Sequence, residues 1–129
     1  MIDEFYMNGV RWRVRFTYPT DPVLVDRTGT ITIGVTDSAT MTIYLSNELR
    51  GSFLTTVVLH ELSHAMMISY GYLEQIHRHC KKRYWVDMEE LIANLIAQQA
   101  KEIFQRAYDI VGAKAIQFVP YMMQERLVA

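Results

Sequence analysis

Hydrophobic and polar residues alternate along the first third of the chain, which is the period of a strand with one buried face. In residues 11–18, four hydrophobic side chains alternate with three arginines and a threonine. The alternation returns at 31–36 and 41–45, with a turn between these two stretches. We therefore predict an antiparallel strand pair over 31–45 and a first strand at 11–18, whose arginines would protect an exposed edge. The apolar residues 23–25 predict one more short strand.

The second half of the chain has the spacing of helices. A helix is predicted over 53–70, with Ser52 as its N-cap and Gly71 as its natural end. It is apolar on most sides, which is typical of a buried helix. A long helix is predicted over 87–111, because its apolar residues recur every three or four positions. The residues between the helices, 72–86, are polar and basic and predict an irregular connection.

Strands that are followed by helices indicate the α+β class. We expect a small antiparallel sheet packed on the first helix and on the long helix. A chain of 129 residues fits a single domain, 1–129. We place its core at about 30–112 and treat 113–129, which has no clear pattern, as a C-terminal appendage.

Composition excludes several classes of function. Thirteen Lys and Arg residues against fourteen Asp and Glu give a net charge of −1, which argues against general nucleic-acid binding. Cys80 is the single cysteine, so neither a disulfide framework nor a cysteine-rich zinc module is possible. No apolar run reaches the roughly 18 residues that a membrane span needs. We expect a cytoplasmic protein without a membrane segment.

One motif carries chemistry, and it lies inside the first predicted helix. His60-Glu61-Leu62-Ser63-His64 is an HExxH sequence, in which the two histidines stand on one helix face and can share a zinc ion. Glu61 can accept a proton from a water on the metal without binding the metal itself. Two histidines can also meet at this spacing by chance. Here the flanking residues are apolar, and buried polar side chains there would lack partners unless a metal binds them.

A catalytic zinc site needs a third protein ligand. In metzincins this ligand is a histidine six residues after the second histidine, with a glycine at the midpoint, but Tyr70 and Met67 occupy those positions. A glutamate on the long helix is the other possibility. Glu89 and Glu90 are neighbours that point about 100° apart on a helix, so we expect only one of them to face the metal.

Glu90 is the favoured ligand because Asn94 follows it one turn later. The amide oxygen of Asn94 could accept a hydrogen bond from the second nitrogen of a zinc-bound histidine. Ala93, one turn after Glu89, could not. Glu90 also fits position N3 of a capping box that begins at Asp87. If capping were its only role, the third ligand would be Glu89 or a group from outside the chain.

The motif His60-Glu61-x-x-His64, followed by Glu90-x-x-Ala93-Asn94-x-x-Ala97, resembles the gluzincin metallopeptidases. It is most similar to the small ImmA/IrrE-like and minigluzincin-type proteins that mobile elements often carry. The strand pair that leads into the motif is also similar, so that the resemblance covers about residues 30–105.

The resemblance implies a minimal zincin core that holds one zinc ion. Zinc would be bound by His60, His64 and Glu90, and Glu61 would act as the general base. One edge strand of the pair at 31–45 would align an extended peptide substrate by strand addition.

Peptide hydrolysis also needs a group that stabilises the oxyanion. The candidates are Tyr70, Tyr72, Tyr84 and His77, with His79 as a further one, because all of them lie in or beside the predicted connection. None has a specific spacing, and each could equally be a surface residue.

The sequence thus predicts a zinc-dependent metalloendopeptidase that acts on a protein or peptide. The alternative is a zinc-binding regulatory or interaction module with a latent or lost peptidase activity. In that case the fourth zinc position would be filled, by His77 or His79 for example, or the cleft would be covered by the C-terminus. A helical adaptor without metal is a third possibility. The basic run 77–83 is expected to be a solvated loop, and the sequence predicts no particular oligomeric state.

Overall fold

The computed structural model describes residues 2–113, and these residues form an α+β fold, as the sequence predicted. A first compact unit spans Met1–Gln98, and a second begins at Gln99. The candidate site lies entirely in the first unit. The elements, in chain order, are β1 (Glu4–Met7), β2 (Val10–Thr17), the 3-10 helix η1 (Pro22–Leu24), β3 (Gly34–Asp37), β4 (Thr42–Ser46), α1 (Gly51–Ser69), α2 (Tyr72–His79), the 3-10 helix η2 (Lys82–Tyr84) and α3 (Trp85–Val111).

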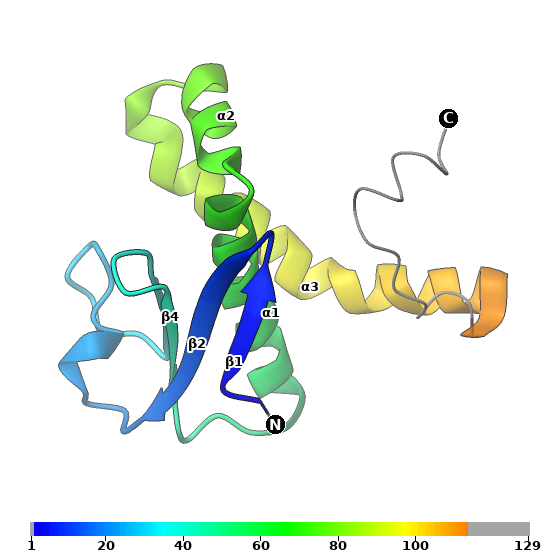
Figure 1. Ribbon diagram of the computed structural model, residues 1–129, viewed down its shortest axis with the longest axis horizontal. Coiled ribbons are helices and arrows are strands. Elements are labelled where there is room, and N and C mark those ends of the chain that lie inside the picture. Colours follow the sequence, from blue (N-terminus) through cyan, green and yellow to red (C-terminus); the bar gives the residue numbers. More distant parts are fainter. Residues whose placement is uncertain (1, 114–129) are drawn as a thin grey trace. The chain divides into compact units, whose positions relative to one another are not determined.

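The four strands form one mixed sheet in the order β1-β2-β4-β3 (Figure 1). The β1–β2 and β3–β4 pairs are antiparallel, whereas β2 and β4 are parallel. The antiparallel pair predicted at 31–45 is therefore confirmed in its pairing, but the prediction of an all-antiparallel sheet is wrong. The sheet is mixed because β4, the second strand of the β3–β4 hairpin, pairs in parallel with β2. Strand β3 is thereby left at the edge.

The N-terminal strand β1 was not predicted, and it changes the position of β2. The turn Asn8-Gly9 has φ values of 50° and 76°, the left-handed pair that a two-residue hairpin turn requires. Because β2 pairs with β1 on one side and with β4 on the other, it is no edge strand. The predicted edge role of its arginines is therefore wrong. Its alternation is confirmed, since Trp12 is fully buried between exposed arginines.

The segment between β2 and β3 folds as a turn-rich arm instead of the predicted strand. Asp21 caps η1 by accepting a hydrogen bond from the backbone N–H of Val23, and Pro22 suits the first turn. Only a single isolated bridge, between Val25 and Ile31, has strand pairing there. The predicted strand 31–36 is consequently reduced to β3.

Helix α1 packs along one face of the sheet (Figure 1), where Trp12, Ile43 and Leu45 meet Val57 and Ala65 in the main core. The helix begins one residue earlier than Ser52, after Arg50 as the N-cap, so that Ser52 does not cap it. It ends at Ser69, one residue before the predicted end, and Gly71 follows as the predicted stop, with φ 72° in the left-handed region that glycine tolerates.

The irregular connection predicted over 72–86 is wrong, because this segment forms α2 and η2. Leu73 and Ile76 place one apolar face of α2 against Met67 of α1 and Ala93 of α3. The many basic side chains of the segment hid this short apolar spacing. The long helix α3 begins at Trp85, two residues before the predicted start, and ends at Val111 as predicted.

Two further observations concern membranes and the chain end. Within residues 2–113, no helix is both long and apolar enough to cross a bilayer. The predicted C-terminal appendage, 113–129, lies outside the described residues except for its first residue.

Candidate metal centre

Helix α1 brings the two histidines of the motif together. The four-residue spacing places His60 and His64 on one face, with 3.2 Å between their Nε2 atoms. Their ring centroids are 4.9 Å apart, at an interplanar angle of 64°. Only 8% of the His64 side chain is exposed, against 23% for His60. Two ring nitrogens therefore converge on one point at the edge of the core.

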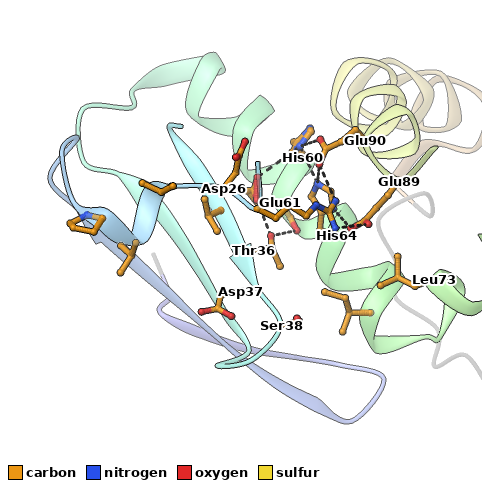
Figure 2. Close-up of a pocket in the computed structure, with 16 residues that line it drawn as sticks. Asp26, Thr36, Asp37, Ser38, His60, Glu61, His64, Leu73, Glu89 and Glu90 are labelled. Carbon is orange, nitrogen blue, oxygen red and sulfur yellow. Dashed lines mark hydrogen bonds and ion pairs between the residues drawn. The ribbon is translucent and has the colours of Figure 1, made fainter. Parts of the chain in front are cut away.

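Helix α3 adds a carboxylate to the same point (Figure 2). Glu90 lies with Oε2 3.2 Å from Nε2 of His60 and with Oε1 3.3 Å from Nε2 of His64. Each of the three side chains offers one ligand atom, and these atoms all lie within 4.8 Å of one another. This group of side chains could hold a metal ion. The capping-box role considered for Glu90 is wrong, since α3 begins at Trp85 and Asp87 is already helical.

Glu89, the neighbour of Glu90, contacts the other side of His64. Its Oε1 lies 2.8 Å from Nδ1 of His64, and both side chains are 8% exposed. When Nδ1 carries the proton and donates a hydrogen bond to Glu89, the lone pair of Nε2 is free for a metal ion. Of the two neighbouring glutamates, Glu90 faces the point where the Nε2 atoms converge, and Glu89 does not. Glu89 instead contacts the opposite ring nitrogen of His64.

Asn94 does not have the contact expected of it. It is exposed, and the hydrogen bonds found over residues 2–113 include none between Asn94 and either histidine. It lines a second, smaller pocket of about 260 Å³, which His60 and Glu61 also line. The hydrogen bond to a histidine that was expected from the amide oxygen of Asn94 comes instead from the carboxylate of Glu89, which contacts His64.

Charge and burial shift the pKa values of these groups in opposite directions. Burial alone would lower the pKa of His64, but its hydrogen bonds to Glu89 and Glu90 outweigh burial and raise the pKa to about 9. Hydrogen bonds from His60 and His64 hold the pKa of Glu90 well below its usual range. Without a metal, a proton on His64 thus supplies the positive charge at the point where the ligand atoms meet.

Glu61 lies beside the three converging side chains, and a residue of the sheet holds its carboxylate in place. Its Oε2 accepts a hydrogen bond of 2.8 Å from Oγ1 of Thr36 in β3, and Oε1 is 3.9 Å from Nε2 of His60. Burial raises the pKa of Glu61, although Thr36 and the two histidines act in the opposite direction. A carboxylate with a raised pKa is suited to proton transfer near neutral pH.

Glycine at position 34 allows this close approach. A Cβ atom on Gly34 would lie 3.0 Å from Val57 and 3.2 Å from Cγ of Glu61. Strand β3 can therefore pass directly over α1, which brings Thr36 into reach of Glu61.

These side chains open into a pocket of about 500 Å³ (Figure 2). One wall is helical, and the opposite wall consists of the arm between β2 and β3 together with β3 itself. Arg27, which the sequence reasoning did not single out, reaches the site from this arm. The pocket is lined by Pro22, Val23, Val25, Asp26, Arg27, Val35, Thr36, Asp37, Ser38, His60, Glu61, His64, Ile68, Leu73, Glu89 and Glu90.

The residues predicted to stabilise an oxyanion lie elsewhere. Tyr70 and Tyr72 stack on each other, with ring centroids 5.9 Å apart. His77 stacks on Trp85 at 3.7 Å, and Tyr84 lies under the guanidinium of Arg83. His79 lies at the end of α2, with its Nδ1 2.6 Å from the carbonyl oxygen of Gln75. The residues found to line the pocket include none of these aromatic or histidine candidates.

Comparisons with protein-family models, with curated proteins and with solved structures gave no match. The function proposed below therefore depends on the distances, burial and charges of the side chains described here.

Proposed function

We propose that this protein is a zinc-dependent metallopeptidase of minimal gluzincin type. The observation that carries the proposal is the convergence of two histidine Nε2 atoms and the Glu90 carboxylate, with the buried Glu61 beside them. Two histidines and one glutamate are a donor set of catalytic zinc sites, in which a further position stays open for water or substrate. A structural zinc site would instead have four protein ligands.

Each residue has a separate role in the proposed hydrolysis. When bound, the ion would polarise the peptide carbonyl and make a coordinated water more acidic. Glu61 takes the proton of the attacking water and later gives it to the leaving amine. Thr36 holds the Glu61 carboxylate by its 2.8 Å hydrogen bond, and Glu89 holds the ring of His64. Glu61 and His64 are therefore each fixed by a partner from another element.

The sheet edge beside the site suits an extended peptide. Strand β3 stands at the end of the strand order, and its residues Val35, Thr36 and Asp37 line the pocket. A peptide that pairs with such an edge gains main-chain hydrogen bonds and lies next to Glu61. Strand addition at β3 is thus our proposal for how a protein or peptide substrate binds.

The alternative function remains a zinc-binding regulatory module with latent or lost peptidase activity. One observation favours it, namely that the four predicted oxyanion stabilisers do not line the pocket. The open pocket beside the three converging side chains favours the enzyme. A module in which zinc is purely structural would need a fourth side chain at that point, and His77 is engaged with Trp85.

Zinc content and peptide cleavage, measured together, test the proposal. Wild type should bind one zinc and cleave members of a peptide library. Glu61→Gln should keep its zinc and lose cleavage, because the amide cannot accept the proton. Glu74→Gln is the matched control, since Glu74 is a solvent-exposed glutamate on α2, and it should behave as wild type. Zinc-bound wild type that cleaves no peptide would favour the regulatory module, and cleavage by Glu61→Gln would refute the role of Glu61.

A second variant tests the ligand assignment. Glu90→Ala should weaken zinc binding, because the ion loses its only proposed carboxylate ligand. Unchanged zinc affinity would contradict the assignment and move the third ligand to Glu89 or to a group from outside the chain.

A further inference from the structure

The turn that carries Arg27 is rigidly built. Asp26 accepts hydrogen bonds through Oδ1 from the backbone N–H groups of Thr28, at 2.8 Å, and of Thr30, at 3.1 Å. At its base, Leu24 is fully buried and its carbonyl oxygen accepts a hydrogen bond from the hydroxyl of Thr32. An aspartate that satisfies several backbone donors fixes a turn in one conformation. Arg27 is therefore presented to the pocket from a preorganised position.

Arg27 contacts the neighbouring glutamates Glu89 and Glu90 of α3. Its Nη1 lies 3.0 Å from Oε2 of Glu89, and its Nη2 lies 3.5 Å from Oε1 of Glu90. A guanidinium carries five N–H donors in a fixed fork, so these two contacts leave donors available. The side chain is 49% exposed and lines the same pocket as Glu61. It is anchored at one edge and accessible to a ligand at another.

The pocket offers few other groups that could stabilise a developing negative charge. Among the residues found to line it, Arg27 is the only lysine or arginine. The hydroxyl of Thr36 is already bonded to Glu61. The lining brings five carboxylates, whose charge a divalent ion and Arg27 together would offset in part, namely those of Asp26, Asp37, Glu61, Glu89 and Glu90. The contact with Glu89 joins a half-exposed guanidinium to a buried carboxylate, and it engages only one nitrogen of the guanidinium fork.

We propose that Arg27 is the electrophile that stabilises the oxyanion of the hydrolysis reaction. This inference rests on the proposed function. As water attacks the carbonyl carbon, a C–O bond forms and the π electron pair moves to the carbonyl oxygen, while Glu61 takes the proton. Arg27 donates hydrogen bonds to that oxygen and transfers no proton. The electron pair then returns, the C–N bond breaks, and the proton of Glu61 goes to the amine.

Kinetics of Arg27→Ala give the first test, with a peptide that wild type cleaves. We expect kcat to fall by about 10²–10³-fold, the usual loss of an oxyanion donor, with KM within about threefold. Arg27→Lys should recover only part of kcat, and added guanidinium ion should partly restore Arg27→Ala. Arg106→Ala is the control, since Arg106 is an exposed arginine that pairs with Asp109 three residues along its helix. Full kcat in Arg27→Ala would overturn the inference.

Binding experiments give a test that needs no turnover. Zinc-loaded wild type should bind a peptide phosphonate, whose tetrahedral anionic group imitates the transition state, and Arg27→Ala should bind it about 10²-fold more weakly. Zinc affinity should be equal in the two proteins. Equal phosphonate affinity, or none in zinc-loaded wild type, would overturn the inference. A lower zinc affinity that accounts for the whole loss would show that Arg27 only holds Glu89 and Glu90. Wild type without zinc would instead refute the proposed function itself.

Discussion

The two walls of the pocket are built in different ways (Figure 2). On the helical wall, α1 supplies His60 and His64 at a spacing that helix geometry sets, and the packing of α3 near α1 adds Glu90. On the opposite wall, Thr36 comes from a strand and Arg27 from a turn, and each acts on a glutamate of the helical wall. In this account the helical wall holds the metal. The other wall sets the charge and the position of the groups around the metal.

The largest expected effect is on the helical wall. His64→Ala removes a proposed ligand and leaves Glu89, a carboxylate with 8% of its side chain exposed, without its histidine partner. Zinc affinity should fall by more than the roughly 10–100-fold typical of an outer partner. Stability should also drop by about 1–3 kcal/mol, because a buried acceptor is left unsatisfied. Zinc titration and denaturant unfolding would measure both, with exposed His79→Ala as control. Retained zinc affinity would contradict the ligand assignment.

Glu89 should have the next largest effect, because it orients His64 without reaching the metal itself. Glu89→Gln should weaken zinc binding by roughly 10–100-fold, the usual range for the partner of a metal-bound histidine. A competition titration with a zinc chelator measures this loss. A loss as large as that of His64→Ala would show that Glu89 is itself a ligand, and no loss would show that its 2.8 Å contact has no role in binding.

Zinc binding should depend on pH through His64. Its pKa is raised to about 9, above the usual 6.5, so that in the metal-free protein zinc must displace a proton at neutral pH. Affinity should therefore rise about tenfold per pH unit up to about pH 9, and binding at pH 7 should release about one proton. Calorimetry in two buffers of different ionisation enthalpy counts the protons. Binding without proton release would contradict the charge state assigned to His64.

The same shift affects the stability of the metal-free protein. Because the pKa of His64 is raised on folding, its contribution is complete below about pH 6.5 and is lost as the pH rises towards 9. Glu89 and Glu90 have lowered pKa values, so that their contribution is present above about pH 4.5 and is lost in acid. Metal-free stability should be greatest between these limits.

The smallest effect is expected on the strand side. Thr36→Val keeps the shape of the side chain and removes the hydrogen bond to Glu61. That bond lowers the pKa of Glu61, so without it the pKa should rise further and the acid limb of kcat/KM should move to higher pH. Zinc affinity should stay the same, and stability should change by about 1 kcal/mol. An unchanged pH profile would mean that Thr36 does not tune Glu61.

The difference between the walls also explains what could be predicted from the sequence. His60 and His64 stand four residues apart in an apolar helix, so a local pattern was enough to find them. Glu90 was favoured because Asn94 follows it one turn later, although Asn94 makes none of the hydrogen bonds found to the two histidines. Glu89 was considered only as an alternative ligand, and its contact with Nδ1 of His64 was missed because the sequence does not show that the two nitrogens of His64 face different residues. Arg27 was missed because only the fold brings residue 27 next to residues 89 and 90.

The errors in the fold have a similar physical origin. The short strand β1 has only four residues and depends on pairing with β2, so its own pattern is weak. The strand predicted at 23–25 failed because Asp21 and Pro22 favour a helical turn. The apolar residues of α2 lie on a single face of the helix. The basic side chains between them in the sequence obscured their helical spacing.

X-ray absorption of the protein after titration with zinc tests the central claim most directly. We predict one zinc per chain, with nitrogen and oxygen ligands at about 2.0–2.2 Å, two imidazoles among them and no sulfur. The signal of one imidazole should be lost in His60→Ala. Failure to bind a stoichiometric zinc ion, or a sulfur ligand at about 2.3 Å that would involve Cys80, would contradict the account.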